Sequence, residues 1–200
     1  MAKAAFVGFG EVNTPKELII KKCSDALKAL ENEGVECISV YPVTDDYEEK
    51  DINMAIDALK GKEFDYLVVC IAGWIPTHAV VKVTEHFRHK PMVLWGLCGW
   101  MEDGRIVTTA DQAGTTAIRK TFYDLGYNFK YIYDIIGLPC NSKKVAQFGV
   151  AAAAAEKLRH AKAGMAGYRD MNLYGTQVDG PSLKRVVGTE IETFEMLEME

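Results

Sequence analysis

The stretch that decides the fold is Tyr66-Leu67-Val68-Val69-Cys70-Ile71-Ala72-Gly73-Trp74, in which an unbroken apolar run ends in glycine and an aromatic residue. A strand without polar alternation is typical of a parallel sheet that helices cover on both faces. Two similar runs, Ala4–Val7 and Pro91–Leu94, also break off next to glycine and an aromatic residue. Because open α/β sheets bind ligands beyond the carboxyl ends of their strands, the three breaks predict a single ligand-binding edge.

Helical patterns separate the strand-like runs along the first 162 residues. The clearest helix start is Thr14-Pro15, with threonine as N-cap and Glu17 completing a capping box. Five strand–helix units predict an α/β fold, specifically a flavodoxin-like, doubly wound, parallel five-stranded sheet in residues 1–162. The fourth strand is expected to end at Gly96 and to lead into a long, functional loop over 97–110. Residues 163–200 are expected to begin a second α/β domain that is incomplete.

Composition excludes several classes of function. A net charge of -5 gives no basic field for nucleic acid. No apolar run approaches the roughly 20 residues that span a bilayer, and the first residues lack the apolar core of a signal peptide, so a cytoplasmic protein is expected. Five cysteines without paired spacing argue against a disulfide framework or a zinc site.

Glu11 and Trp74 are the first candidate ligand contacts. Glu11 follows Gly8-Phe9-Gly10, which lacks the glycine spacing of nucleotide loops, and its negative charge would repel a phosphate. A neutral polyol offers hydroxyl donors to that carboxylate, although Glu11 could instead help to cap the following helix. Trp74 offers a flat apolar face of the kind on which a sugar ring stacks.

Other catalytic constellations find little support in the sequence. Cys98, between Gly96 and Gly99, faintly suggests a nucleophile on a strand-to-helix elbow, but the acidic turn that follows would not lower its pKa. No set of glutamate, aspartate and histidine shows the spacing of an octahedral metal site. Small neutral ligands therefore remain the better hypothesis.

The junction between the two expected domains carries a family resemblance. It runs from Gly164 through Arg169 to Gly175 and is followed by Gly188-Thr189-Glu190-Ile191-Glu192. In this pattern, and in Gly73-Trp74 and 111–114, the chain resembles the amino-terminal part of the L-fucose/L-arabinose isomerase family.

The resemblance implies an aldose–ketose isomerase of carbohydrate metabolism that uses a divalent metal, usually Mn²⁺. It also implies that the metal ligands and acid–base groups lie in later domains outside this chain, so this chain by itself is expected to be inactive. Members of the family form homo-oligomers in which the first domain of one subunit reaches over a neighbour's active site. On that pattern Trp74, Gln112 and Glu11 match residues that contact the sugar.

Two departures from the family pattern put L-arabinose in doubt as the substrate. Glu11 stands where the family has a glutamine, and Thr115 stands where arabinose isomerases place a histidine. The main alternative is a non-catalytic flavodoxin-like module that binds a sugar or a partner, which a genuine stop after Glu200 would favour over a continuing reading frame. A flavin protein is a third option, disfavoured because the first strand is not followed by a phosphate loop rich in hydroxyl side chains.

Overall fold

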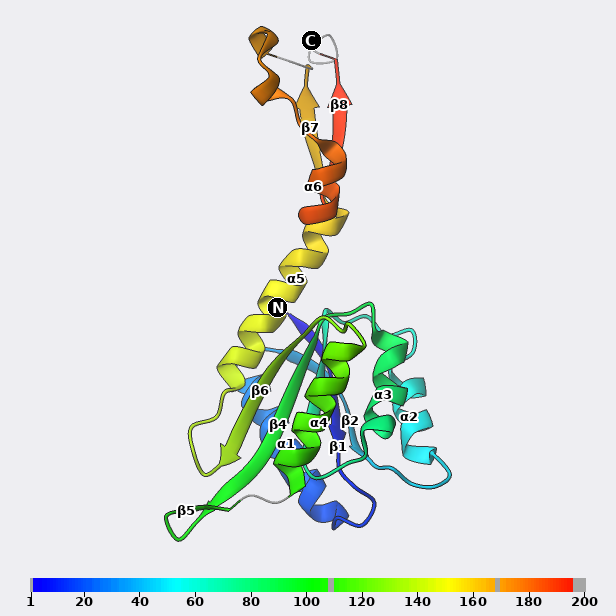
Figure 1. The fold of residues 1–200 in the computed structure, drawn as a ribbon, viewed down its shortest axis with the longest axis vertical. Coiled ribbons are helices and arrows are strands. Elements are labelled where there is room, and N and C mark those ends of the chain that lie inside the picture. The colour runs from blue at the N-terminus through cyan, green and yellow to red at the C-terminus, as the bar shows by residue number, and fades with distance from the viewer. Residues whose placement is uncertain (1, 108–109, 168–169, 196–200) are drawn as a thin grey trace. The chain divides into compact units, whose positions relative to one another are not determined.

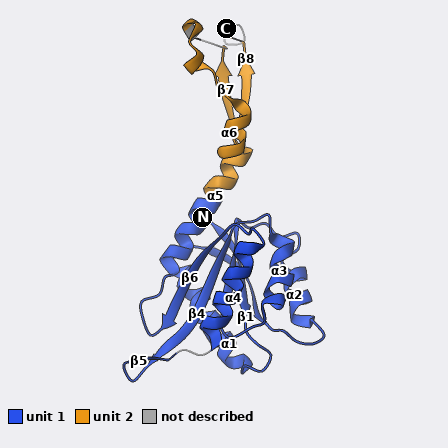
Figure 2. Ribbon diagram, viewed as in Figure 1, with its two compact units in different colours: residues 1–152 blue, residues 153–200 orange. Residues whose placement is uncertain are grey.

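The computed structural model describes residues 2–107, 110–167 and 170–195. The chain divides into two compact units, residues 1–152 and 153–200 (Figure 2). This division falls inside a helix, whereas the sequence pattern places the boundary after that helix, at residue 162. Tyr168 and Arg169 of the resemblance junction, and the last glutamates, lie outside the described residues.

Strands and helices alternate through the first unit (Figure 1). The strands are β1 (Lys3–Phe9), β2 (Glu36–Val43), β3 (Tyr66–Ile71), β4 (Met92–Glu102), β5 (Arg105–Val107) and β6 (Phe129–Ile136). The helices are α1 (Lys16–Asn32), α2 (Lys50–Leu59), α3 (Thr77–Thr84), the 3-10 turn η1 (Glu85–Phe87), α4 (Ala110–Asp124) and α5 (Ser142–His160), which continues into the second unit.

The sheet confirms the α/β class and corrects its details. Parallel strands run in the order β2, β1, β3, β4, with β6 parallel on β4, and β5 pairs antiparallel with β4. The described sheet is therefore mixed and six-stranded, not the purely parallel five-stranded sheet expected. The cause is a hairpin where a loop was predicted: β4 continues past Gly96 and turns at Asp103-Gly104, both with positive φ, into β5.

Helices pack against both faces of this sheet (Figure 1). On one face α2, α3 and α4 bury apolar side chains against alternate residues of β1, β3 and β4, among them Val7, Val69 and Leu94. On the other face α1 comes so close to β1 that a Cβ at Gly8 would lie 2.3 Å from the Cys23 sulfur. Burial of continuous strands on two faces explains why their sequences show no polar alternation.

The start of α1 differs from the sequence prediction. Pro15, not Thr14, occupies the N-cap position, and no side-chain hydrogen bond caps the helix. The Thr14 N–H instead donates to the carbonyl of Glu11 at 2.9 Å, which closes a turn between β1 and α1. The predicted capping box is therefore wrong, while the helix itself is confirmed.

The second unit is small and open. It contains the parallel strands β7 (Lys162–Ala166) and β8 (Glu190–Phe194), helix α6 (Gly180–Val186), and the 3-10 turns η2 (Asp170–Asn172) and η3 (Tyr174–Thr176). Among its described residues only Thr189 is buried. This unit thus lacks a hydrophobic core of its own within the part that the structure describes.

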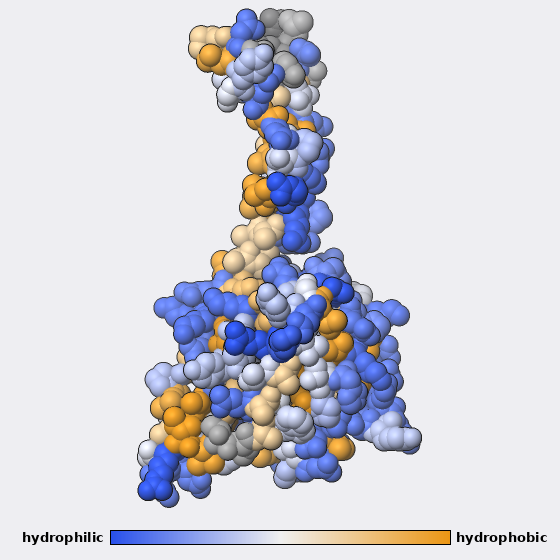
Figure 3. Space-filling model, viewed as in Figure 1, coloured by the Kyte–Doolittle hydropathy of each residue, from blue (hydrophilic) through white to orange (hydrophobic). Residues whose placement is uncertain are grey.

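The surface of the first unit is mostly hydrophilic on the side shown in Figure 3, with hydrophobic side chains gathered near β5 at the lower left. Ile106 on β5 and Ile136 at the end of β6 are both exposed, and β4 pairs with both strands. Within the described ranges, no helix has the length and apolar character that crossing a membrane requires.

Candidate functional site at the carboxyl ends of the strands

Trp74 lies just beyond the carboxyl end of β3, and hydrogen bonds hold its main chain on two sides. Its N–H donates to Asp111 Oδ1 at 3.0 Å, at the start of α4. Its carbonyl accepts the N–H of Glu11, which follows β1, at 2.6 Å. A main-chain hydrogen bond therefore joins two of the three contact residues predicted from the sequence, Glu11 and Trp74.

The indole ring of Trp74 lies against the first turns of α4. A Cβ built at Gly114 would lie 3.0 Å from Trp74 Cε3, a very close contact that a small shift of the ring would have to relieve. Gln112 lies two residues earlier on the same helix and is exposed. All three predicted contact residues thus lie at the same end of the sheet, with Trp74 and Glu11 each partly exposed.

A buried ion pair supports this arrangement and was missed in the sequence. Lys22 of α1 lies with its ammonium 3.3 Å from Asp111 Oδ2, and the two side chains are only 8% and 10% exposed. The same ammonium donates to the carbonyl of Ala72 at 2.9 Å and lies 5.9 Å from the centre of the Trp100 ring. Asp111 therefore joins α1 to Trp74 through its two carboxylate oxygens.

The ion pair could have been suspected from helical spacing. Lys22 lies between Ile19 and Cys23 on the face that α1 buries, where a lysine is rare unless it is paired. From the sequence, Asp111 is noted only as part of the 111–114 stretch of the family resemblance. Its partner cannot be inferred from spacing, because 89 residues separate the two in sequence.

The electrostatics of this edge disfavour an anionic ligand. The ammonium of Lys22 is already engaged by a carboxylate and a carbonyl, so its charge is largely neutralised. Glu11 adds a partly exposed carboxylate, whose Oε1 lies 3.5 Å from Asn13 Nδ2. Acceptors and an apolar ring are the groups offered, and these suit a neutral molecule with hydroxyl groups.

Trp100 and Thr115 have positions that their sequence interpretation did not anticipate. Trp100 belongs to the extended β4, paired with Val107 and Ile136, and not to a loop. Thr115 is fully buried, and its hydroxyl donates to the carbonyl of Asp111 at 2.7 Å. Thr115 therefore stabilises the start of α4 and is not available to a ligand.

Neither the cysteines nor the histidines supply catalytic groups at this edge. Burial raises the pKa of the Cys98 thiol, which lies 3.9 Å from the hydroxyl of Thr115, so the reactive thiolate is disfavoured. His78, four residues after Trp74, is exposed. The nucleophile interpretation gains no support from this geometry.

Manganese, which the family resemblance implies, does not fit the residues described. No group of three or more histidine, cysteine, aspartate or glutamate side chains in the described ranges is placed to hold a metal ion. No step of the function proposed below therefore passes through a metal held by these residues. No protein-family model and no curated protein matches the chain.

Proposed function

We propose that residues 1–152 form a flavodoxin-like, doubly wound domain that contributes sugar contacts to a cytoplasmic aldose–ketose isomerase. In this proposal the chain is the amino-terminal part of that enzyme, and polypeptide outside the chain holds the catalytic Mn²⁺. Trp74, Glu11 and Gln112 contact the sugar across a subunit interface of a homo-oligomer. The reaction is proposed from the family resemblance, and the position of the three side chains at one end of the sheet supports a sugar as the ligand.

The observation that carries the proposal is the double anchoring of Trp74. Its main chain is bonded to Glu11 on one side and to Asp111 on the other, while its ring packs on Gly114. An aromatic platform held in this way loses little conformational entropy when a ring stacks on its open face. Carboxylate and amide groups beside the platform suit sugar hydroxyls, which donate and accept hydrogen bonds.

The test is binding of L-fucose and L-arabinose to the whole chain, followed by saturation-transfer NMR of the sugar protons. We expect a signal with the wild type that Trp74→Ala weakens about 2–10-fold, the range for losing one aromatic contact. Tyr47→Ala is the matched control, because Tyr47 is a fully exposed aromatic residue on the same unit. Equal signals from both variants would contradict the assignment of Trp74.

A second assay tests the division of labour between this chain and the rest of the enzyme. With Mn²⁺ and a panel of aldoses, the purified chain should bind sugar without converting it to the ketose. Turnover by the chain alone would show that its own residues complete a catalytic site.

A further inference from the structure

We propose that the free edge of β6 is a docking site for an acidic, extended segment of another protein, which joins the sheet as an additional strand. The proposal is independent of the sugar site, since β6 lies at the border of the sheet and the sugar contacts follow β1, β3 and the start of α4. It rests on the unpaired main chain of β6, on the grooves beside it and on their charge.

The main chain of β6 is open over its first half. Within the described residues β6 pairs only with β4, in register from Met92↔Phe129 onward. The Met92 N–H donates to the carbonyl of Asn128, so in a parallel ladder the even-numbered residues of β6 face β4 and the odd-numbered ones face outward. The N–H and carbonyl of Tyr131 thus point away from the sheet.

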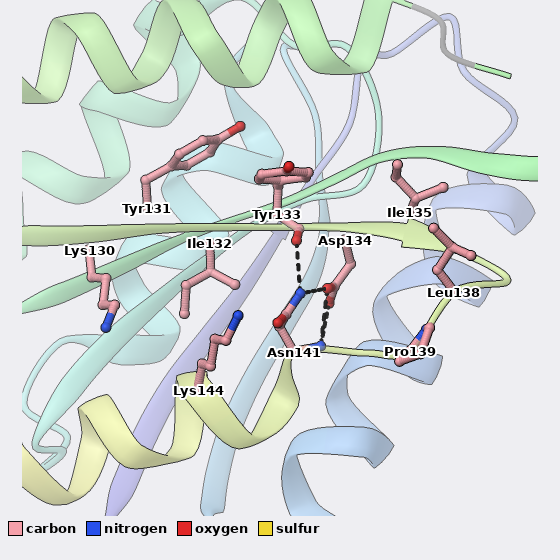
Figure 4. A pocket seen from close by; sticks show the side chains of 10 residues that line it. All are labelled: Lys130, Tyr131, Ile132, Tyr133, Asp134, Ile135, Leu138, Pro139, Asn141 and Lys144. Carbon is pink, nitrogen blue, oxygen red and sulfur yellow. Dashed lines mark hydrogen bonds between the residues drawn. The ribbon is translucent and has the colours of Figure 1, made fainter. Parts of the chain in front are cut away.

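The second half of the same edge is already covered. Asn141 donates from Nδ2 to the carbonyl of Tyr133 at 3.1 Å (Figure 4). The Leu138 N–H donates to the carbonyl of Ile135 at 3.0 Å. An incoming strand is therefore limited to 129–132 and would stop at Asn141. A short open edge of this kind suits a peptide better than a long strand of another sheet.

Grooves run along both sides of the open segment. One has a volume of about 530 Å³ and is lined by β6, the following loop and Lys144 of α5, with Ile132 and Leu138 among its apolar groups (Figure 4). The other, of about 500 Å³, lies between β6 and α4 and is lined by Phe129, Tyr131 and Tyr123. Side chains that alternate along an added strand would enter the two grooves in turn.

The cations that line the two grooves favour an acidic segment on this edge. The two grooves are lined by four cations, Lys130 and Lys144 in the first and Arg119 and Lys120 in the second, of which Lys120 is already paired with Asp124. Asp134, which also lines the first, is 6% exposed, and its carboxylate already accepts bonds from Trp95 Nε1 and the main chain of Asn141.

This region is basic in a chain that is acidic as a whole. Residues 116–150 contain five lysines and arginines against two aspartates, whereas the whole chain carries a net charge of -5. Two copies paired through β6 would bring basic grooves together and repel each other, while an acidic segment is attracted. A partner with glutamate or aspartate at alternate positions therefore fits the edge best.

The test uses a fluorescein-labelled octapeptide in which glutamate alternates with valine, titrated with the whole chain and followed by fluorescence anisotropy. We expect saturable binding that the double variant Lys130→Glu/Lys144→Glu weakens about tenfold or more. The matched control, Lys28→Glu/Lys60→Glu, changes net charge equally on exposed lysines of α1 and the end of α2, and should stay within about twofold of the wild type. Circular dichroism checks that both variants are folded.

A second peptide separates strand addition from simple charge attraction. Methylating the main-chain nitrogen of alternate valines removes hydrogen-bond donors without changing charge, and should also weaken binding about tenfold. Equal affinity for the methylated peptide, or no binding of the parent peptide, would overturn the proposal. The proposal would also be overturned if the chain formed a dimer that excludes the peptide and that Lys130→Glu/Lys144→Glu dissociates. In that case a second copy of the chain would occupy the edge of β6.

Discussion

The two compact units of this chain differ in what holds their residues in place. In residues 1–152 the central strands are buried on both faces, and even a lysine and an aspartate are buried as a pair. In residues 153–200 most of the described side chains are exposed, including large apolar ones such as Met171 and Tyr174, and Thr189 alone among them is buried. The comparison teaches that similar local elements, a strand, a helix and a parallel strand, gain stability only from the surface that they bury.

The largest expected effect compares two ion pairs. Lys22→Met removes the buried cation that faces the Asp111 carboxylate and should cost about 3–5 kcal/mol of unfolding free energy. Lys184→Met in the second unit breaks an exposed pair, Lys184–Glu190 at 3.2 Å, and should cost less than about 1 kcal/mol. Urea unfolding followed by tryptophan fluorescence reports on the first unit, where all three tryptophans lie, and far-UV circular dichroism adds the second unit. A cost below about 1 kcal/mol for Lys22→Met would contradict a stabilising role of the buried ion pair.

A smaller effect is expected from truncating apolar side chains. Leu67 on β3 is fully buried, so Leu67→Ala should cost about 2–5 kcal/mol through lost contacts and a cavity. Leu173 in the second unit is 51% exposed, and Leu173→Ala should change stability by no more than about 0.5 kcal/mol. Similar costs at the two positions, measured in the same denaturation experiment, would show that the second unit buries Leu173 in solution.

The smallest effect concerns two helix caps. Asp46 accepts the N–H groups of Lys50 and Asp51 at the start of α2, and Asp179 accepts the N–H of Ser182 at the start of α6. We expect Asp46→Ala to lower the midpoint of thermal unfolding of the first unit by about 2–4 °C, and Asp179→Ala to leave it unchanged. Asp46→Asn, which keeps one acceptor oxygen, should fall between wild type and Asp46→Ala.

The same caps make a prediction about pH. Hydrogen bonds from the Asp51 and Lys50 main chain lower the pKa of Asp46, and bonds from Ser182 lower the pKa of Asp179. Since each folded pKa lies below the unfolded value of about 4, the stabilisation is present above that pH and disappears as the pH falls through the folded pKa. The difference in thermal midpoint between wild type and Asp46→Ala should therefore shrink in acid, and a difference that stays constant down to pH 2 would contradict this.

Much of the fold could be predicted because local patterns and burial agree. The unbroken apolar run Tyr66–Ile71 predicts a strand covered on both faces, and the structure confirms it as β3. The hairpin at Asp103-Gly104 was missed although aspartate followed by glycine is a strong turn signal. The long segment after Gly96 was predicted to be a loop, whereas most of it continues β4 and forms β5.

The candidate site was only partly predictable. Trp74 was singled out because glycine and tryptophan follow a buried strand, and this local feature survives in the structure. The pairing of Lys22 with Asp111 depends on how α1 and α4 flank the end of β3, which no local pattern encodes. The cations beside β6 form no cluster in the sequence, because α4, β6 and α5 bring them together only after folding.

Gly8 and Gly10 allow the helix that carries Lys22 to pack closely against the sheet. Cβ atoms at these positions would come within 2.3 Å of the Cys23 sulfur and 2.5 Å of the Ile19 side chain, the two neighbours of Lys22 on the inner face of α1. A methyl group at either glycine would force the facing side chain of α1, or the helix itself, to move. The absence of side chains at Gly8 and Gly10 therefore lets α1 lie close to β1. Lys22 of this helix reaches Asp111, which in turn holds the main chain of Trp74.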